Sequence, residues 1–209
     1  MSEKEMRTYA VEFRAGRDEH HGPQISGRAI VYNAVTDIGG MYNEIIMPGA
    51  LDETDLRDVR LLVNHDFSMI PLARSRNNTT NSTMQLMPDN EGLMIRADLD
   101  IERNADAAAL YSACERGDIS GMSFAFIVSV NGDEWEDLDS EKPTRRITRI
   151  DRVLEVSAVT WPAYEQTTIS ARDAQALESA RAALESAKAS AEAEARSRKR
   201  KILKILLEV

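Results

Sequence analysis

Short apolar segments follow one another through the first 172 residues of the chain, several with polar residues at alternate positions, and this pattern predicts β-strands. Gly, Pro, Asn and Asp separate the segments and mark turns. The expected strands are residues 7–14, 27–33, a short strand ending before Pro48, and residues 59–63, 84–87, 93–99, 123–130 and 145–160. The segments 84–87 and 93–99 should form a hairpin with its tip at 89–92, and residues 161–164 should close the sheet.

One segment of this body carries helix signals. Asn104 is a suitable N-cap for a helix over residues 105–116, and Gly117 is a suitable residue to end it. Polar loops are expected around Trp135 and over residues 18–23, which include His20 and His21. Many strands with few helices predict an α+β domain, built as a mostly antiparallel β-barrel packed with a few helices.

The composition changes abruptly near residue 172, where we place a boundary between a body, residues 1–172, and a tail, residues 173–209. The tail is rich in Ala, Glu, Ser, Lys and Arg and contains no Gly or Pro, so it should be helical. Leu177 and Leu184 lie seven residues apart and give this helix a thin apolar stripe. A basic cluster, 196–201, and an apolar end, 202–207, follow.

Charge is divided unequally between the two parts. The body has 18 Lys and Arg against 29 Asp and Glu, a balance of −11, and the tail has 8 against 6, a balance of +2. An acidic body repels nucleic-acid phosphates, so specific nucleic-acid binding is not expected of it. No apolar run reaches the roughly 18 residues that a membrane-spanning helix needs, and we expect no membrane partner.

A single cysteine, Cys114, excludes an internal disulfide and a cysteine-based zinc cluster. Its apolar neighbours in the expected helix indicate a small buried residue rather than a nucleophile. His20 and His21 fall in a polar loop, and the ligand spacings of zinc sites are absent. We therefore expect neither a metal nor another cofactor.

Imidazole chemistry then depends on His65, which follows the apolar run 61–63. A serine hydroxyl attacks efficiently only when a neighbouring base takes its proton, and a neutral imidazole is the usual base. Ser123 is the first residue of an otherwise apolar strand, where a buried hydroxyl requires a hydrogen-bond partner or has a functional role. Ser120 competes with it, but its place in a Gly-containing turn suggests a turn-stabilising role.

A third group should hold the imidazole in the right tautomer. Glu155 is our candidate, because it lies in a strand with apolar residues on both sides, where an ionised carboxylate is costly unless paired. Ser157 shares its face and could bond into the same cluster. Asp66 is the alternative, although alternation along a strand would turn it away from His65. His65, Ser123 and Glu155 are thus the expected catalytic residues.

Five segments together resemble the prohead proteases of tailed bacteriophages, in the order that this family has: residues 27–33, 44–50, 62–66, 117–126 and 154–164. The resemblance covers nearly all of residues 7–172. The histidine of the family's Asn-His-Asp motif falls on His65, and its nucleophile falls on Ser123. Two positions depart from the usual pattern of the family. Ala125 stands where relatives commonly have a second glycine, and Ala73 stands where the usual Leu-Gly-Arg motif has its glycine.

The resemblance implies a fold similar to that of herpesvirus assemblin and a serine endopeptidase that matures the capsid. Herpesvirus relatives use a second histidine as third member; this chain has none at a matching place, so Glu155 is inferred for that role. The implied partners are the major capsid protein with its scaffold segment and the protease itself, cut by autocleavage. The implied location is the prohead inside the host bacterial cytoplasm.

Three interpretations of the tail stay open, and in one of them the basic cluster and its apolar end contact DNA or an anionic membrane surface. The tail resembles the removable C-terminal segments that target such proteases to the shell interior. Its apolar stripe is equally typical of a dimerising helix, which would make the protein a homo-oligomer. The alternative function is that of a non-enzymatic assembly or scaffolding protein. In that case the tail carries the assembly function, and the body is a docking module.

Overall fold

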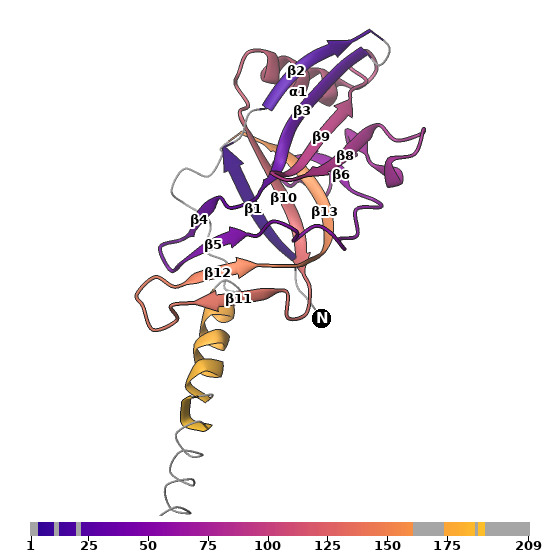
Figure 1. Ribbon diagram of the computed structural model, residues 1–209. Coiled ribbons are helices and arrows are strands. Elements are labelled where there is room, and N and C mark those ends of the chain that lie inside the picture. Colours follow the sequence, from indigo (N-terminus) through magenta and orange to yellow (C-terminus); the bar gives the residue numbers. More distant parts are fainter. Residues whose placement is uncertain (1–3, 11–12, 20–21, 161–173, 187, 191–209) are drawn as a thin grey trace, which may run out of the picture.

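A computed structural model describes residues 4–10, 13–19, 22–160, 174–186 and 188–190, and the strands in these ranges form three sheets (Figure 1). The first sheet has the order β1 (Lys4–Ala10), β10 (Gly121–Val128), β13 (Ile150–Val159), β6 (Arg60–Val63), β7 (Ala73–Arg74). The second has the order β11 (Asp133–Glu136), β12 (Thr144–Ile147), β5 (Tyr42–Ile46), β4 (Val35–Ile38). The third has the order β2 (Phe13–Asp18), β3 (Gly22–Val31), β9 (Gly92–Asp98), β8 (Met84–Asp89).

The predicted α+β class is confirmed. Most strand pairs are antiparallel, while β12 with β5 and β13 with β6 are parallel. None of the three sheets formed by the described residues closes on itself, so the barrel part of the prediction is not confirmed. Apolar side chains from all three sheets, among them Ile25, Ile46 and Phe124, nevertheless pack into one shared core.

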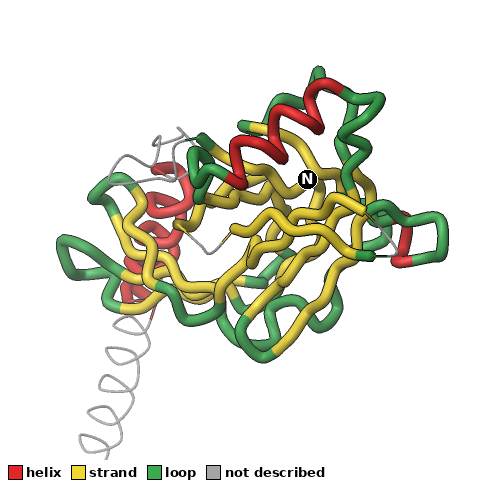
Figure 2. Tube along the Cα trace, turned by 90° about the horizontal axis from the view of Figure 1, so that it is seen from above, coloured by secondary structure: helices red, strands yellow, loops and turns green. Residues whose placement is uncertain are grey.

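Helix α1 (Ala105–Glu115) confirms the predicted helix, and its caps explain why it starts and stops where it does. The Asn104 side chain accepts hydrogen bonds from the backbone N–H groups of Asp106 at 3.0 Å and Ala107 at 3.3 Å. Gly117 follows the helix with φ +75, a conformation that glycine adopts without strain. The helix packs against β2 and β3 and lies across the strands in Figure 2.

Several predicted boundaries are wrong. The expected strand 7–14 is two strands in different sheets, β1 and β2, which a continuous apolar pattern cannot reveal. β4 was not expected, and β3 begins at Gly22, inside the expected loop 18–23. The predicted hairpin of β8 and β9 is confirmed. The predictions for His20, His21 and residues 161–164 lie outside the described residues.

The expected acidic loop around Trp135 is strand β11 instead. Its acidic residues have partners on the neighbouring strand, because Asp133 pairs with Arg145 at 2.7 Å and Glu136 pairs with Arg146 at 2.7 Å. The Trp135 ring meets that of Tyr42 edge to face, with 4.9 Å between centroids. Tertiary contacts therefore override the low strand propensity of this acidic stretch.

The first part of the tail is helical over residues 174–186 and 188–190 and contacts the body. Leu177 is buried against Ile38 and Tyr42, whereas Leu184 is half-buried. Burying a leucine contributes about 1.5–3 kcal/mol, so this contact helps to hold the helix against the body. The Lys188 ammonium adds an ion pair with Asp139 at 2.6 Å. Among the described residues, no helix is long and apolar enough to span a bilayer.

A buried ion-pair cluster joins β1 to the second sheet. The guanidinium of Arg7 pairs with Glu44, and that of Arg145 contacts Glu5 at 2.7 Å and Glu44 at 3.1 Å. Burial alone would lower the pKa of Arg7, but the Glu44 carboxylate more than compensates, and the pKa is raised. Removing one partner of such a pair costs about 3–5 kcal/mol, so the cluster fixes β1 in place.

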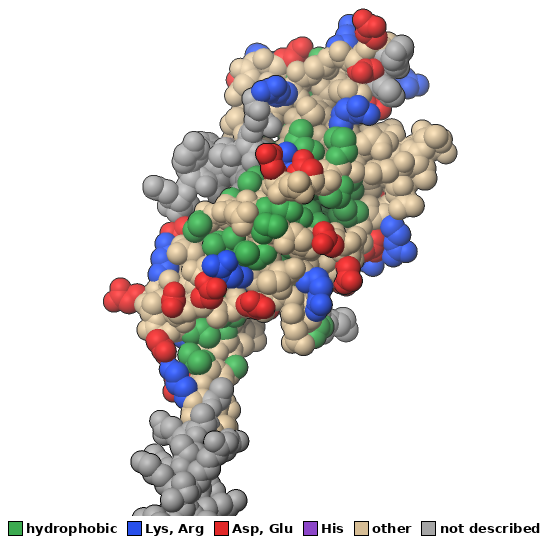
Figure 3. Space-filling view, viewed as in Figure 1, with side chains coloured by type: hydrophobic (Ala, Val, Ile, Leu, Met, Phe, Trp, Pro, Cys, Tyr) green, Lys and Arg blue, Asp and Glu red, His purple; other side chains and the backbone are tan. Residues whose placement is uncertain are grey.

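The surface in Figure 3 has apolar side chains gathered near the middle of the visible face, with acidic and basic side chains interspersed around them. That face shows no single basic patch of the kind that follows a nucleic-acid backbone.

Candidate active site

His65 lies in a turn directly after β6. Leu61 and Leu62 are buried and anchor this strand in the core, and the strand ends at Val63. Asn64 and His65 then adopt left-handed backbone conformations with φ of 48 and 57. Such conformations cost about 1–3 kcal/mol each and persist only where surrounding contacts determine them.

Strand β13 provides those contacts. The backbone N–H of Asn64 donates to the carbonyl of Ala158 at 2.9 Å, and the Asn64 side-chain oxygen accepts from the backbone N–H of Thr160 at 3.0 Å. The backbone N–H of His65 donates to the Ser157 hydroxyl at 3.1 Å. The turn is thus held onto β13, and the imidazole is directed back over the sheet.

Ser123 lies beneath this imidazole on β10, the strand next to β13. Its side chain is buried, and its hydroxyl oxygen lies 2.6 Å from Nε2 of His65. Ser123 is in register with Ser157 across the strand pair, which explains how one turn reaches both residues.

Glu155 lies on the other side of the imidazole. Its Oε1 is 2.6 Å from Nδ1 of His65, and its Oε2 accepts a hydrogen bond from the Ser157 hydroxyl at 2.5 Å. A buried carboxylate requires such partners, and here both oxygens have one. With the carboxylate ionised, the ring proton is on Nδ1, and the lone pair of Nε2 faces the Ser123 hydroxyl.

The structure therefore brings together His65, Ser123 and Glu155, with Ser157 bonded to the same group. Asp66 does not join them, because its exposed carboxylate accepts from the backbone N–H and the hydroxyl of Ser68, at 2.9 and 2.5 Å. Strand alternation is not what turns Asp66 away from His65, since residues 64–66 follow the end of β6. Ser120 is exposed and lies before β10.

Two contacts of the Ser123 hydroxyl were not anticipated, and both come from β1. The hydroxyl oxygen lies 2.7 Å from the carbonyl oxygen of Arg7 and 2.8 Å from the hydroxyl of Thr8. No local signal identifies Thr8, because its place depends on the pairing of β1 with β10.

Cys114 lies on the buried face of α1, as expected, and burial raises the pKa of its thiol to about 12. The reactive species of a cysteine is the thiolate, which is nearly absent at neutral pH when the pKa is this high. We expect iodoacetamide to leave Cys114 unmodified in the native protein and to alkylate it fully after unfolding, as measured by intact mass. Rapid alkylation of the native protein would contradict its assignment as a structural residue.

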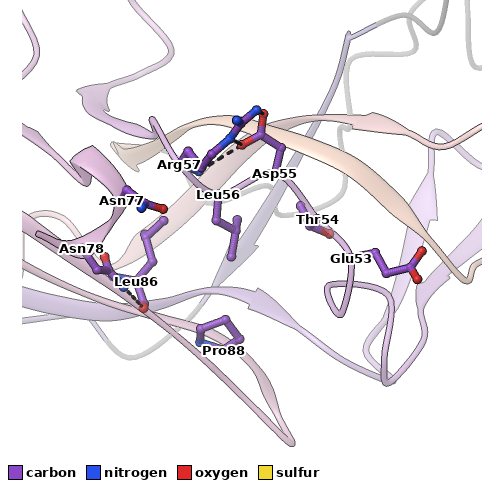
Figure 4. Close-up of a pocket in the computed structure, with 9 residues that line it drawn as sticks. All are labelled: Glu53, Thr54, Asp55, Leu56, Arg57, Asn77, Asn78, Leu86 and Pro88. Carbon is purple, nitrogen blue, oxygen red and sulfur yellow. Dashed lines mark hydrogen bonds and ion pairs between the residues drawn. The ribbon is translucent and has the colours of Figure 1, made fainter.

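A surface pocket of about 510 Å³ lies apart from this group, since none of the three candidate residues lines it (Figure 4). Its polar groups bond to one another: Arg57 pairs with Asp55 at 2.9 Å, and the Asn78 amide exchanges hydrogen bonds with the backbone of Leu86 at 2.8 and 3.0 Å. Within the described residues, no group of three or more His, Cys, Asp and Glu side chains could hold a metal ion.

The arrangement can perform acyl transfer, because a hydroxyl, a base and an orienting carboxylate lie in sequence within hydrogen-bond distance. Comparison with known proteins agrees with this chemistry: a family model described as caudovirus prohead serine protease matches residues 8–181. No curated protein matches the chain, and no solved structure does.

Proposed function

The chain belongs to the caudovirus prohead serine proteases, and on this basis we propose that it cleaves the scaffold segment of the major capsid protein, and then itself, as the prohead matures. Membership in the family makes it a serine peptidase of capsid maturation. The observation that supports a serine-protease mechanism in this chain is the contact of His65 with both Ser123 and Glu155, at 2.6 Å on each side of the ring.

In the proposed mechanism, Ser123 is the nucleophile. Nε2 of His65 accepts the hydroxyl proton as the oxygen attacks the scissile carbonyl, and later gives a proton to the leaving amine. Glu155 keeps the other ring proton on Nδ1 and stabilises the imidazolium that forms. Ser157 holds both the carboxylate and the backbone of His65, so it serves as a positioning residue.

The proposal also covers location and domain organisation. The protease acts inside the prohead within the host bacterial cell, with the capsid protein and its own chain as substrates. Residues 1–172 form the protease domain, and residues 173–209 are a segment that targets the enzyme and is then removed. The contact of Leu177 with Ile38 and Tyr42 supports a tail that stays near its own body until cleavage.

Co-expression with the capsid subunit tests the proposal. The wild-type chain should shorten the capsid subunit, as seen in its intact mass, and the His65→Ala chain should leave it at full length. The alternative function, a non-enzymatic scaffold, predicts that shells form and mature equally well with either chain and without any cleavage.

We expect the cleavage rate to fall as the pH is lowered from about 8 to 5, because a general-base mechanism requires an unprotonated imidazole. Only the neutral ring accepts the serine proton, so protonation of Nε2 removes the base. The measurement is kcat/KM against pH, with the melting temperature recorded at each pH to exclude unfolding. A flat profile over this range would rule out His65 as the base.

A further inference from the structure

We propose that Thr8 is a further catalytic residue, whose hydroxyl donates a hydrogen bond to the Ser123 oxygen and stabilises the negative charge that this oxygen gains during attack. The inference rests on the proposed function, in which Ser123 is the nucleophile. The Thr8 hydroxyl lies 2.8 Å from the reacting atom itself, so it would act on that atom directly.

Strand pairing explains the position of Thr8. On β1, Thr8 is in register with Ser123 on β10, and Ser123 is in register with Ser157 on β13. Residues in register on adjacent strands point to the same face of a sheet. Three hydroxyls from three neighbouring strands therefore form a row, with the turn that carries His65 fixed over one end of it.

The hydrogen-bonding capacity of the Ser123 hydroxyl shows what Thr8 contributes. A hydroxyl has one proton to donate and two lone pairs that accept. Nε2 of His65, at 2.6 Å, and the carbonyl oxygen of Arg7, at 2.7 Å, are both acceptors, so they compete for that one proton. Among the residues that the structure describes, Thr8 is the side chain that donates to this oxygen.

The hydrogen bond from Thr8 to the Ser123 oxygen strengthens during nucleophilic attack. As the Ser123 oxygen bonds to the scissile carbonyl carbon, its O–H bond breaks, the proton moves to Nε2 of His65, and the carbonyl π pair moves onto the carbonyl oxygen. The Thr8 proton stays on Thr8. The attacking oxygen becomes more negative before its new bond is complete, and a hydrogen bond to a charged acceptor is stronger than one to a neutral acceptor. The interaction is therefore stronger in the transition state than in the resting enzyme, which is the requirement for acceleration.

The buried ion-pair cluster holds this donor in place. Adjacent strand residues point to opposite faces, so the Arg7 side chain leaves the sheet on the side away from Thr8. There it pairs with Glu44 of β5, and both side chains are buried. This anchor fixes the position of β1 against β10, and Thr8 needs no reorganisation to reach Ser123.

The test measures the rate at which a fluorophosphonate, a probe that reacts with activated serine hydroxyls, labels the full-length chain. Thr8→Val has nearly the same shape without the hydroxyl, Thr8→Ala also lacks it but is smaller, and Thr8→Ser retains it. Thr36→Val is the matched control, since Thr36 is a half-buried strand residue on β4. We expect both Thr8→Val and Thr8→Ala to lower the labelling rate by about 10- to 100-fold. Thr8→Ser should restore most of the rate, and Thr36→Val should leave it unchanged.

Peptide-cleavage kinetics and pH dependence separate chemistry from packing. The loss in Thr8→Val should fall on kcat rather than KM, with the shape of the pH profile and the melting temperature unchanged. A wild-type or faster labelling rate in Thr8→Val, or a loss confined to Thr8→Ala, would overturn the role of Thr8. The Ser123→Ala variant separates the role of Thr8 from the proposed function. If this variant is not labelled, the proposed function stands even when the role of Thr8 is overturned. If this variant is still labelled, the proposed function is overturned too.

Discussion

Ser123→Ala is expected to lower kcat/KM for cleavage of the capsid subunit by about 10⁶-fold, the size of effect known for loss of a nucleophile that acts with a histidine base. The Ser123 oxygen lies 2.6 Å from Nε2 of His65, and no described serine shares that contact. Without the hydroxyl, the imidazole has no proton to accept and no acyl-enzyme can form. A double variant with His65→Ala should be no slower than the single variant, because the two residues act as one unit.

The matched control is Ser120→Ala, three residues away on the exposed approach to β10. It removes a hydroxyl from the same segment and should leave the rate unchanged. The melting temperature of each variant shows whether the fold survives, since Ser123→Ala also removes a buried donor from the carbonyl of Arg7. Cleavage by folded Ser123→Ala at more than a trace of the wild-type rate would remove the nucleophile assignment.

Glu155→Gln is expected to lower kcat by about 10³- to 10⁴-fold, an effect of the size seen when an orienting carboxylate becomes an amide in other triads. The carboxylate oxygen 2.6 Å from Nδ1 can only accept a hydrogen bond, so it keeps the ring proton on Nδ1. An amide can donate to Nδ1 instead. The ring proton then moves to Nε2, which no longer has a lone pair for the Ser123 proton. The amide also cannot neutralise the imidazolium that forms during attack.

Glu134→Gln provides the control, because Glu134 is exposed on β11 and lies outside the catalytic group. Single-turnover rates of both variants at neutral pH separate chemistry from product release. If Glu155→Gln cleaves at the wild-type rate while remaining folded, the orienting role belongs to another residue.

Local patterns predicted those parts of the fold that local interactions determine. The N-cap Asn104 and the end at Gly117 define α1, and the apolar run before His65 defines β6. The acidic stretch around Trp135 has no local strand signal, because its strand depends on partners distant in sequence, above all Arg145. The arrangement of the strands into three sheets could not be predicted from the sequence either. A closed barrel and three separate sheets are built from strands with the same local sequence pattern.

In the site, too, features that depend on local sequence could be predicted, and features that depend on distant partners could not. Ser123 and Glu155 could be selected from the sequence because each is a polar residue in an apolar strand, where burial without a partner is costly. The conformation of His65 could not be predicted, because its left-handed turn is stabilised by bonds to β13 rather than by its own sequence. Thr8 could not be found for the same reason: its importance follows from strand register.

The most direct measurement of the central claim, that Ser123 is a nucleophile activated by His65, is the position of the bond that a fluorophosphonate forms. Mass spectrometry of the digested protein should find one phosphonyl group per chain, on Ser123, and His65→Ala should nearly eliminate it. A label on another residue, or no label on a chain that still cleaves the capsid subunit, would contradict the claim.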